Sequence, residues 1–515
     1  MKAYLLYRDH DFDLECEAAW SEPALVQDLD LNTLYQAMAR GDAFIYDVVK
    51  RVVPFSSTDH AEICWRQAIL RDCLIHEATV REIYDIAIEA IEAQRRNYYS
   101  VFSSSASSVL HAGRERIQLF VSVLRKLRQV ADTKATEFRS DGFAQFFSMI
   151  QRELTDEYFG EIQNCVKELK FNGGVLISAG LGVGNKGVNY VLRKPHGRPR
   201  SFLTRLFAKR PPSLTFRIAD RDENGARALA DLEARGINLI ANALAQSADH
   251  ILSFFTMLRT ELAFYIGCAS LKNELERRGV AVCFPVAHAS DTMRHDFKGL
   301  YDVSLALRTE NPPVGNDLQG DGAQLTVITG ANQGGKSTFL RGIGLAQIMV
   351  QCGMFVAAAS FSANVCDGIF THYKREEDAS MKSGKLDEEL KRMSEIVDHI
   401  REHSLLLSNE SFAATNEREG SEIARQVILA LLEKHVKIVF VTHLYVLAHG
   451  LYEQKTPAMA FLRAERRSNG ERTFRLLRAE PLQTSFGEDL YTEIFVARGE
   501  TPPDEPSAAC LSDVG

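Results

Sequence analysis

The stretch that decides the fold is 325-LTVITGANQGGKST-338, which joins an apolar run to a glycine-rich loop. Residues 325–329 are apolar or β-branched, as in a buried strand, and residues 339–350 continue in a helical pattern. Gly330, then Gly335 followed by Lys336 and Ser337, fits the phosphate-loop pattern. Because glycines let main-chain N–H groups turn toward a phosphate, and a helix N-terminus attracts the same anion, we expect a nucleotide site here.

Each part of this loop has an expected role. Lys336 is expected to bridge the β- and γ-phosphates and to serve the reaction, and the Ser337 hydroxyl to ligate Mg²⁺. The expected nucleotide contacts are Gly330, Ala331, Asn332, Gln333, Gly334, Gly335, Lys336, Ser337 and Thr338. A strand before and a helix after the loop argue against a chance match. ATP and Mg²⁺ are therefore the expected cofactors.

A second acidic strand is predicted at 404-SLLLSNE-410. Glu410 ends this run, where it could orient an attacking water, although a surface or helix-capping glutamate is the alternative. The preceding position normally holds an aspartate for Mg²⁺, but here it is Asn409, a neutral and weaker ligand for a hard cation. Hydrolysis is therefore expected to be slow, or Mg²⁺ to depend more on Ser337. A third strand, 436–441, leads to His443, which is either a γ-phosphate sensor or a structural histidine.

These motifs, in this order, resemble the MutS family. The loop 330-GANQGGKST-338 resembles the MutS-family phosphate loop, with asparagine two residues after its first glycine. Further similar segments are 314-VGNDL-318, 352-CGMFV-356, 367-DGIFT-371, the signature-loop segment Ser383-Gly384-Lys385, 415-TNEREG-420 and 441-VTHL-444. Together they cover roughly residues 313–445, a quarter of the chain, and are far more specific than the phosphate loop alone.

The resemblance implies an ABC-type ATPase that works as a dimer. Each ATP would lie between one subunit's phosphate loop and the partner's signature loop, here around Ser383 and Gly384. The family couples that ATP state to a clamp on DNA, so duplex or branched DNA is the expected partner. A homodimer is the first expectation, with a heterodimer left open. Because the chain begins close to the helical core, we expect it to lack the N-terminal mismatch-recognition domain with its Phe-x-Glu wedge.

The expected fold class is multidomain α plus α/β, a mostly helical core and lever region followed by a C-terminal ABC-type P-loop ATPase domain. The expected segments are a helical N-terminal core at 1–130, a helical and turn-rich clamp-like insert at 131–224, long lever helices at 225–290, the ATPase domain at 291–500 and a disordered tail at 501–515. Within the insert, residues 193–217 carry eight Arg or Lys and no acid. This basic arm is either a phosphate-contacting clamp element or a solvated loop.

Two other patterns are better explained by local structure than by a functional role. The residues Gly182, Gly184 and Gly187 mimic a dinucleotide fingerprint, but no helix is predicted after them, so a turn-rich β segment is favoured. After the signature loop, residues 386–400 form an apolar helical stripe typical of a core helix. Its acids, Asp387, Glu388, Glu389 and Glu395, are expected on the solvated face.

Composition sets the remaining limits on the 515-residue chain. With 60 Lys and Arg against 68 Asp and Glu, its net charge of −8 argues against a small histone-like binder but allows a local basic face. Nine scattered cysteines without a CxxC pair disfavour a disulfide framework and structural zinc. The most apolar stretch, 344–359, is too short and polar to span a bilayer. A cytoplasmic protein with no membrane partner is expected.

The leading functional hypothesis is a MutS-like, ATP-dependent DNA-binding protein of repair or recombination type, without direct mismatch reading. A slow or non-hydrolysing nucleotide-gated scaffold is the first alternative, because Asn409 replaces the usual aspartate. An ATPase associated with RNA or the ribosome is the second, since a clamp contacts backbone charge more than sequence. A transporter ATPase is disfavoured because the helical region precedes the nucleotide motifs.

Overall fold

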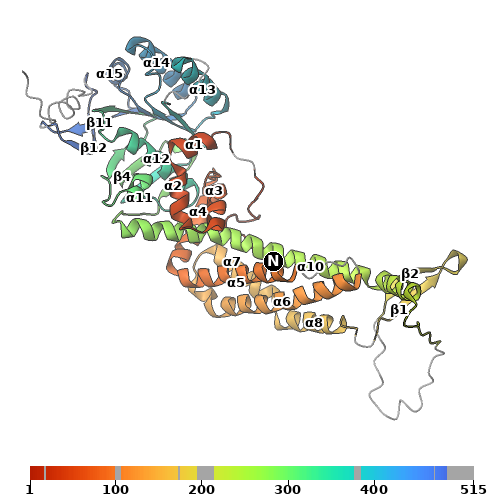
Figure 1. Ribbon diagram of the computed structural model, residues 1–515. Helices are drawn as coiled ribbons and strands as arrows, with labels where there is room; N and C mark the ends of the chain where they lie inside the picture. The colour runs from red at the N-terminus through yellow and green to blue at the C-terminus, as the bar shows by residue number, and fades with distance from the viewer. Residues whose placement is uncertain are drawn as a thin grey trace, which may run out of the picture. The chain divides into compact units, whose positions relative to one another are not determined.

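The computed structural model describes residues 1–16, 19–98, 106–171, 174–193, 214–375, 384–468 and 470–483 (Figure 1). Contacts divide the chain into two compact units that alternate along the sequence. Unit 1 comprises Met1–Phe12 and Arg71–Ile266, and unit 2 comprises Asp13–Leu70 and Gly267–Gly515. The five linear segments expected from the sequence stay a prediction. Ser383, most of the basic arm and the tail at 501–515 lie outside the described residues.

Unit 1 is built mainly from helices. Its elements are the end of α4 (His60–Ile75), α5 (Glu77–Tyr98), α6 (Ala106–Lys134), η1 (Ala135–Glu137), α7 (Asp141–Glu153), α8 (Asp156–Glu168), β1 (Ile177–Leu181), η2 (Val183–Asn185), β2 (Gly187–Leu192) and most of α10 (Glu223–Arg277). Side chains cap the N-termini of α7 and α8. Ser140 accepts a hydrogen bond from the Phe143 N–H, and Thr155 accepts one from the Tyr158 N–H. Figure 1 shows α5, α6 and α10 lying alongside one another.

Within the region 225–290, where long helices are expected, the structure has the single long helix α10. One 18-residue window of α10 reaches a mean hydropathy of 1.3, enough to cross a membrane by length and composition, but 72% of that window is buried inside the protein. Such burial is typical of a core helix, which passes the same test of composition. Gly236 of α10 packs closely on the β1–β2 hairpin, because a Cβ there would lie 2.3 Å from Ile177 Cδ1.

The turn-rich β segment expected around Gly182, Gly184 and Gly187 is confirmed as an antiparallel hairpin of β1 and β2. The glycine pattern at 182–187 occupies the turn between them, where Gly184 has φ of 69°. A dinucleotide fingerprint requires a strand, a tight turn and then a helix. The hairpin therefore supports the turn interpretation of these glycines.

A buried carboxyl in unit 1 holds the N-terminal segment against α10. The Leu5 N–H donates to Glu261 Oε2 at 2.7 Å, and the Tyr265 hydroxyl donates to the Leu5 carbonyl at 2.6 Å. Burial raises the pKa of Glu261 to about 7, and hydrogen bonds from the N–H groups of Leu5, Phe12 and Leu6 offset only part of that rise. Glu261 therefore titrates near neutrality in the folded protein.

This shift predicts a loss of stability as pH rises. The folded protein binds a proton at Glu261 more tightly than the unfolded chain, where the ordinary pKa is 4.5. The free energy of unfolding should therefore fall by on the order of 3 kcal/mol between pH 4.5 and about pH 7, and then level off. Glu261→Gln should lack this fall. Urea denaturation of both proteins across this range, followed by circular dichroism, measures the difference; parallel curves would contradict the assignment.

Unit 2 contains the remaining helices and two sheets. Its helices are α1 (Glu22–Asp28), α2 (Leu31–Ala39), α3 (Ala43–Val52), the start of α4, the end of α10, η3 (Ser290–Thr292), α11 (Val303–Arg308), α12 (Lys336–Gln351), α13 (Lys385–His399), α14 (Glu417–Glu433) and α15 (Tyr445–Glu453). Its strands are β3 (Val286–His288), β4 (His295–Leu300), β5 (Asn316–Gln319), β6 (Leu325–Gly330), β7 (Ser360–Asn364), β8 (Ile369–Tyr373), β9 (Leu405–Asn409), β10 (Lys437–Val441), β11 (Met459–Arg466) and β12 (Arg472–Arg478). The chain as a whole is thus mixed α and α/β.

The larger sheet has the strand order β12-β11-β6-β10-β9-β8, and the smaller sheet has the order β3-β7-β4-β5. Strands β8, β9, β10, β6 and β11 run parallel, whereas β12 pairs antiparallel with β11. Central parallel strands are covered on both faces, which explains why β6 and β10 are mostly apolar or β-branched with nearly every residue buried. The predicted strands at 325–329, 404–410 and 436–441 are confirmed.

Parallel strands end at one edge of a sheet, and here this edge gathers the polar residues predicted from separate motifs. β6 leads into the loop before α12, β9 leads to Glu410, and β10 leads to His443. Ligand sites in such sheets lie outside the carboxyl ends of the strands. The strand order therefore points to this edge as the candidate site.

Candidate functional site

The loop between β6 and α12 is shaped by glycines that touch the neighbouring hairpin. Gly330 has φ of 114° and Gly335 has φ of 86°, a region that side chains rarely adopt. A Cβ at Gly330 would lie 2.8 Å from the Ala464 nitrogen on β11. Arg472 on β12 adds a hydrogen bond from Nε to the Asn332 carbonyl at 2.8 Å. The β11–β12 hairpin therefore supports the loop from outside.

Gly334→Ala should distort this loop. The added Cβ would lie 2.8 Å from the Ala464 Cβ and 2.9 Å from the Ala331 carbonyl oxygen, so the backbone has to shift. Overpacking of this kind costs about 1–3 kcal/mol. Because each 1.4 kcal/mol is a factor of ten, nucleotide affinity should fall about tenfold or more if the loop binds phosphate. Titration with a fluorescent nucleotide measures the change.

Gly450→Ala supplies the matched control, because nothing lies within 4 Å of a Cβ at this position inside α15. Alanine inside a helix is more stable than glycine by about 0.5–1 kcal/mol. The control should therefore raise the free energy of unfolding slightly and leave nucleotide affinity unchanged. Wild-type affinity in the Gly334 variant would show that the loop does not need its observed shape.

Lys336, the first residue of α12, turns back over the loop. Its Nζ donates to the carbonyls of Gly330 at 3.0 Å and Ala331 at 2.9 Å, and the residue is only 5% exposed. Burial lowers the pKa of Lys336, the nearby Glu410 carboxylate opposes this, and Arg472 adds to it. Within the described part of the chain, the ammonium contacts carbonyl oxygens and no full negative charge. An incoming phosphate would supply that charge.

The two predicted Mg²⁺ ligands are brought together at the start of α12. The Ser337 hydroxyl donates to Asn409 Oδ1 at the end of β9, at 2.9 Å. Both oxygens are neutral, and Mg²⁺ is commonly held by few protein ligands together with water and phosphate oxygens. The described residues contain no cluster of three or more His, Cys, Asp or Glu side chains suited to a metal. The pair fits a weakly held Mg²⁺ whose coordination would be completed by water and by the phosphate oxygens of a nucleotide.

Glu410 and His443 meet at the same edge of the sheet. Glu410 Oε1 lies 4.0 Å from His443 Nδ1, and both side chains are about one-third exposed, at 30% and 36%. The backbone of Glu410 is left-handed, with φ of 54°, and its N–H donates to the Val441 carbonyl at 2.9 Å. The two predicted reaction residues are therefore neighbours, although they are more than thirty positions apart in the chain.

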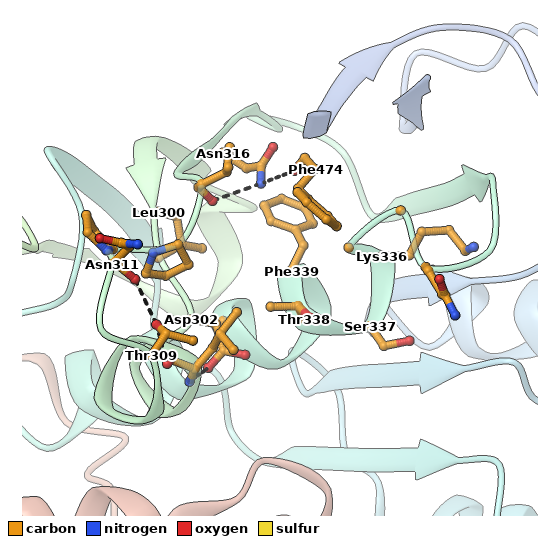
Figure 2. A pocket seen from close by; sticks show the side chains of 18 of the residues that line it. Leu300, Asp302, Thr309, Asn311, Asn316, Lys336, Ser337, Thr338, Phe339 and Phe474 are labelled. Atoms are coloured by element: carbon orange, nitrogen blue, oxygen red, sulfur yellow. Dashed lines mark hydrogen bonds between the residues drawn. The ribbon is translucent and has the colours of Figure 1, made fainter. Parts of the chain in front are cut away.

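A cavity of about 500 Å³ opens beside the loop (Figure 2). Figure 2 shows Lys336 and Ser337 at one end, Asn311 and Thr309 at the other, and Phe339 and Phe474 between them. Its lining residues are Leu300, Asp302, Leu305, Thr309, Asn311, Pro312, Pro313, Val314, Asn316, Asn332, Gln333, Gly334, Gly335, Lys336, Ser337, Thr338, Phe339, Gly342, Glu410 and Phe474. One end is thus cationic and polar, and the rest is mostly apolar with a few polar groups. This shape suits a phosphate joined to an aromatic base.

The predicted loop residues and Glu410 lie together, whereas Gly384 and Lys385, the described residues of the signature segment, do not line this cavity. Gly384 is described and caps the start of α13, whereas Ser383 lies outside the described residues. Sequence reasoning missed Phe474, which β12 brings to the cavity. Asn316 holds it there, donating from Nδ2 to the Phe474 carbonyl at 3.1 Å and accepting from the Leu476 N–H at 2.8 Å.

Comparison with known proteins places this fold and site in a family. Residues 58–278 match the MutS2 N-terminal domain, and residues 326–496 match MutS domain V. The second match contains the loop, both acidic-strand residues and His443. The chain belongs to the MutS family.

Individual relatives agree over shorter stretches. The human MutS protein homolog 4 is 32% identical over 173 residues, which are 32% of this chain and 18% of that protein. The DNA mismatch repair protein MutS of Chlamydia muridarum is 30% identical over 220 residues, 42% of this chain and 26% of that protein. DNA mismatch repair protein MSH3 of Arabidopsis thaliana is 31% identical over 173 residues, which are 33% of this chain and 16% of that protein. The chain therefore spans less than a third of the length of these relatives.

Proposed function

We propose that this protein is an ABC-type ATPase that binds ATP and Mg²⁺ at the loop 330–338 and couples the nucleotide state to binding of DNA. One observation carries the proposal: Lys336, Ser337, Asn409 and Glu410 meet beside one cavity at the carboxyl edge of a parallel sheet. Membership of the MutS family supports it. The phosphates would occupy the cationic end, and the base would lie toward Phe339 and Phe474.

Each residue has a role in this proposal. Lys336 exchanges its bonds to the loop carbonyls for bonds to the β- and γ-phosphates, which stabilises charge without moving the main chain. Ser337 and Asn409 would hold Mg²⁺, which would supply charge neutralisation at the phosphates when bound. Glu410 orients a water for attack on the γ-phosphorus, and His443, whose Nδ1 lies 4.0 Å from Glu410 Oε1, senses the γ-phosphate. Turnover is slow because Asn409 contributes no charge.

The proposed partner of the ATP state is duplex or branched DNA, in a dimer with composite ATP sites. The names of the relatives support this proposal, since two of them are DNA mismatch repair proteins. In such a dimer, the segment around Ser383 and Gly384 of one copy would reach the nucleotide of the other. Direct reading of a mismatched base pair is not part of the proposal.

Asn409 favours one alternative, a scaffold that binds ATP with little or no hydrolysis. Two measurements on the full chain separate the functions: ATP affinity, and steady-state release of phosphate with and without DNA. The ATPase proposal expects saturable binding and turnover that Glu410→Gln removes. Binding without turnover would favour the scaffold, and absence of binding would refute both.

A further inference from the structure

A chain of hydrogen bonds passes through Ser411, the residue that follows Glu410. The proposed reaction assigns no role to the groups in this chain. The hydroxyls of Ser408 on β9 and Ser411 are 2.6 Å apart, and the Ser411 hydroxyl is 2.6 Å from His372 Nδ1 on β8. His372 Nε2 is in turn 3.0 Å from the main-chain carbonyl of Glu389 on α13. All four residues are buried. The chain therefore connects the end of β9 to α13.

The partners determine the direction of these bonds. The Glu389 partner is a carbonyl oxygen, so His372 Nε2 donates. Burial lowers the pKa of His372 to about 4, so the neutral ring has an acceptor at Nδ1. The single Ser411 hydroxyl proton is shared between two acceptors, His372 Nδ1 at 2.6 Å and the His372 carbonyl at 2.8 Å, while Ser411 accepts from Ser408. Removing the Ser411 hydroxyl leaves buried polar groups on both sides without their partner.

Ser411 lies in a turn that depends on its surroundings. It is flanked by Glu410 and Phe412, which both have left-handed backbones, with φ of 54° and 62°. Residues other than glycine keep this conformation only where neighbouring contacts enforce it. The Phe412 ring is fully buried and stacks on His372, with ring centroids 5.5 Å apart. The direction in which Glu410 points is thus tied to Ser411 and His372.

The same chain reaches α13 at a single residue. Glu389 accepts from His372 through its main-chain carbonyl, and its carboxylate accepts from the Phe412 N–H. The sequence pattern predicted Glu389 on the solvated face of its helix; that prediction was wrong, because the residue is only 6% exposed. Glu389 lies one helical turn after the start of α13 at Lys385, which follows Gly384. A shift of α13 would therefore be transmitted through these hydrogen bonds to the turn that carries Glu410.

We propose that Ser411 and His372 are positioning residues that hold the Glu410 side chain in its reactive orientation and couple this orientation to the position of α13. This inference rests on the proposed ATP hydrolysis. In the proposed dimer, the start of α13 is the segment that would meet the partner's nucleotide, so each site would sense the other through this chain. The competing interpretation is that these bonds supply stability alone.

Ser411→Ala tests the inference, with Ser421→Ala as the matched control. Ser421 is also a buried serine of unit 2, but its hydroxyl has no hydrogen-bond partner within the described structure. Because a small misplacement of a reacting group can cost about 100-fold in rate, kcat should fall roughly 10- to 100-fold in Ser411→Ala. ATP affinity should stay within about twofold of wild type, whereas Tm should fall below that of the control, because buried polar groups are left unpaired.

Several results would overturn the inference. Turnover equal to that of Ser421→Ala would do so, and so would a joint loss of Tm, ATP affinity and kcat, which marks a purely structural role. The milder Ser408→Ala, at the end of the chain, serves if Ser411→Ala does not fold. A double variant of Ser411→Ala with His372→Gln should be no slower than the slower single variant, whereas multiplied effects would mean that the two act separately.

The outcome for wild type separates this inference from the proposed function. Wild-type turnover with an unaffected Ser411 variant refutes only the positioning role. A wild-type protein that binds ATP without turnover refutes the hydrolysis on which the positioning role rests, and leaves the nucleotide site standing.

Discussion

Replacing Lys336 by methionine should weaken ATP binding by about 10- to 100-fold. Methionine fills most of the buried volume, so the change removes the ammonium that contacts the Gly330 and Ala331 carbonyls without opening a large cavity. A hydrogen bond to a charged group contributes about 1.5–3 kcal/mol, and each 1.4 kcal/mol is a factor of ten in affinity. Equilibrium titration with ATP, measured by calorimetry, determines the change.

Lys298→Met is the control for this variant, because Lys298 is an exposed lysine of β4 in the same unit. It should bind ATP as wild type does. Thermal unfolding of both variants shows whether either has lost its fold. Unchanged affinity in a folded Lys336 variant would mean that the loop is not the phosphate site.

Glu410→Gln should reduce ATP turnover about 100-fold or more while ATP binding persists. A positioned group that assists proton transfer contributes about 10²- to 10⁴-fold, and glutamine keeps the size of the side chain but cannot take a proton. The carboxylate also raises the pKa of Lys336, so Glu410→Gln removes one contribution that favours the charged ammonium. Single-turnover phosphate release, compared with the ATP dissociation constant, separates the two effects.

The matched control is Glu433→Gln, at the exposed end of α14. It should have wild-type turnover. If Glu410→Gln hydrolyses ATP at the wild-type rate, another group orients the water and Glu410 is a turn residue only. If the variant loses binding and turnover together, its effect is on the shape of the site.

The central strands of unit 2 were predictable because burial on both faces leaves a plain signal. Each of the ranges 325–329, 404–410 and 436–441 has an apolar or β-branched centre (325-LTVIT-329, 405-LLL-407 and 438-IVFV-441), and they form β6, β9 and β10. Because all three are parallel, their last residues had to lie at one edge. The parallel order of the strands therefore explains why Glu410 and His443 lie close together. Their chemical roles stay predictions.

Contacts between distant segments left no local signal. Phe474 reaches the cavity only because β12 lies beyond β11 at the edge of the sheet, and Ala464 supports the loop only because β11 pairs with β6. The six-residue helix α11 was also missed; its one indication is Asp302, which caps it by accepting from the Leu305 N–H. Helices this short depend on their surroundings more than on their sequence.

The buried side of α13 shows why periodicity alone was insufficient. The apolar stripe of residues 386–400 was recognised, and Met393, Ile396 and Ile400 are indeed buried. Glu389 lies beside that stripe and is buried too, because the Phe412 N–H bonds its carboxylate and His372 bonds its main-chain carbonyl. Pattern analysis assigns charged residues to solvent and has no means of anticipating such partners.

The most direct test of the central claim is DNA affinity with and without ATP, measured at one fixed salt concentration for perfect, mismatched and branched duplexes, with structured RNA as competitor. Fixed salt is essential because phosphate contacts make affinity strongly salt-dependent. The account predicts that ATP changes the dissociation constant for at least one DNA form in wild type, and leaves it unchanged in Lys336→Met. DNA affinity that is the same with and without ATP in a wild-type protein saturated with nucleotide, or a preference for RNA over every DNA form, would contradict it.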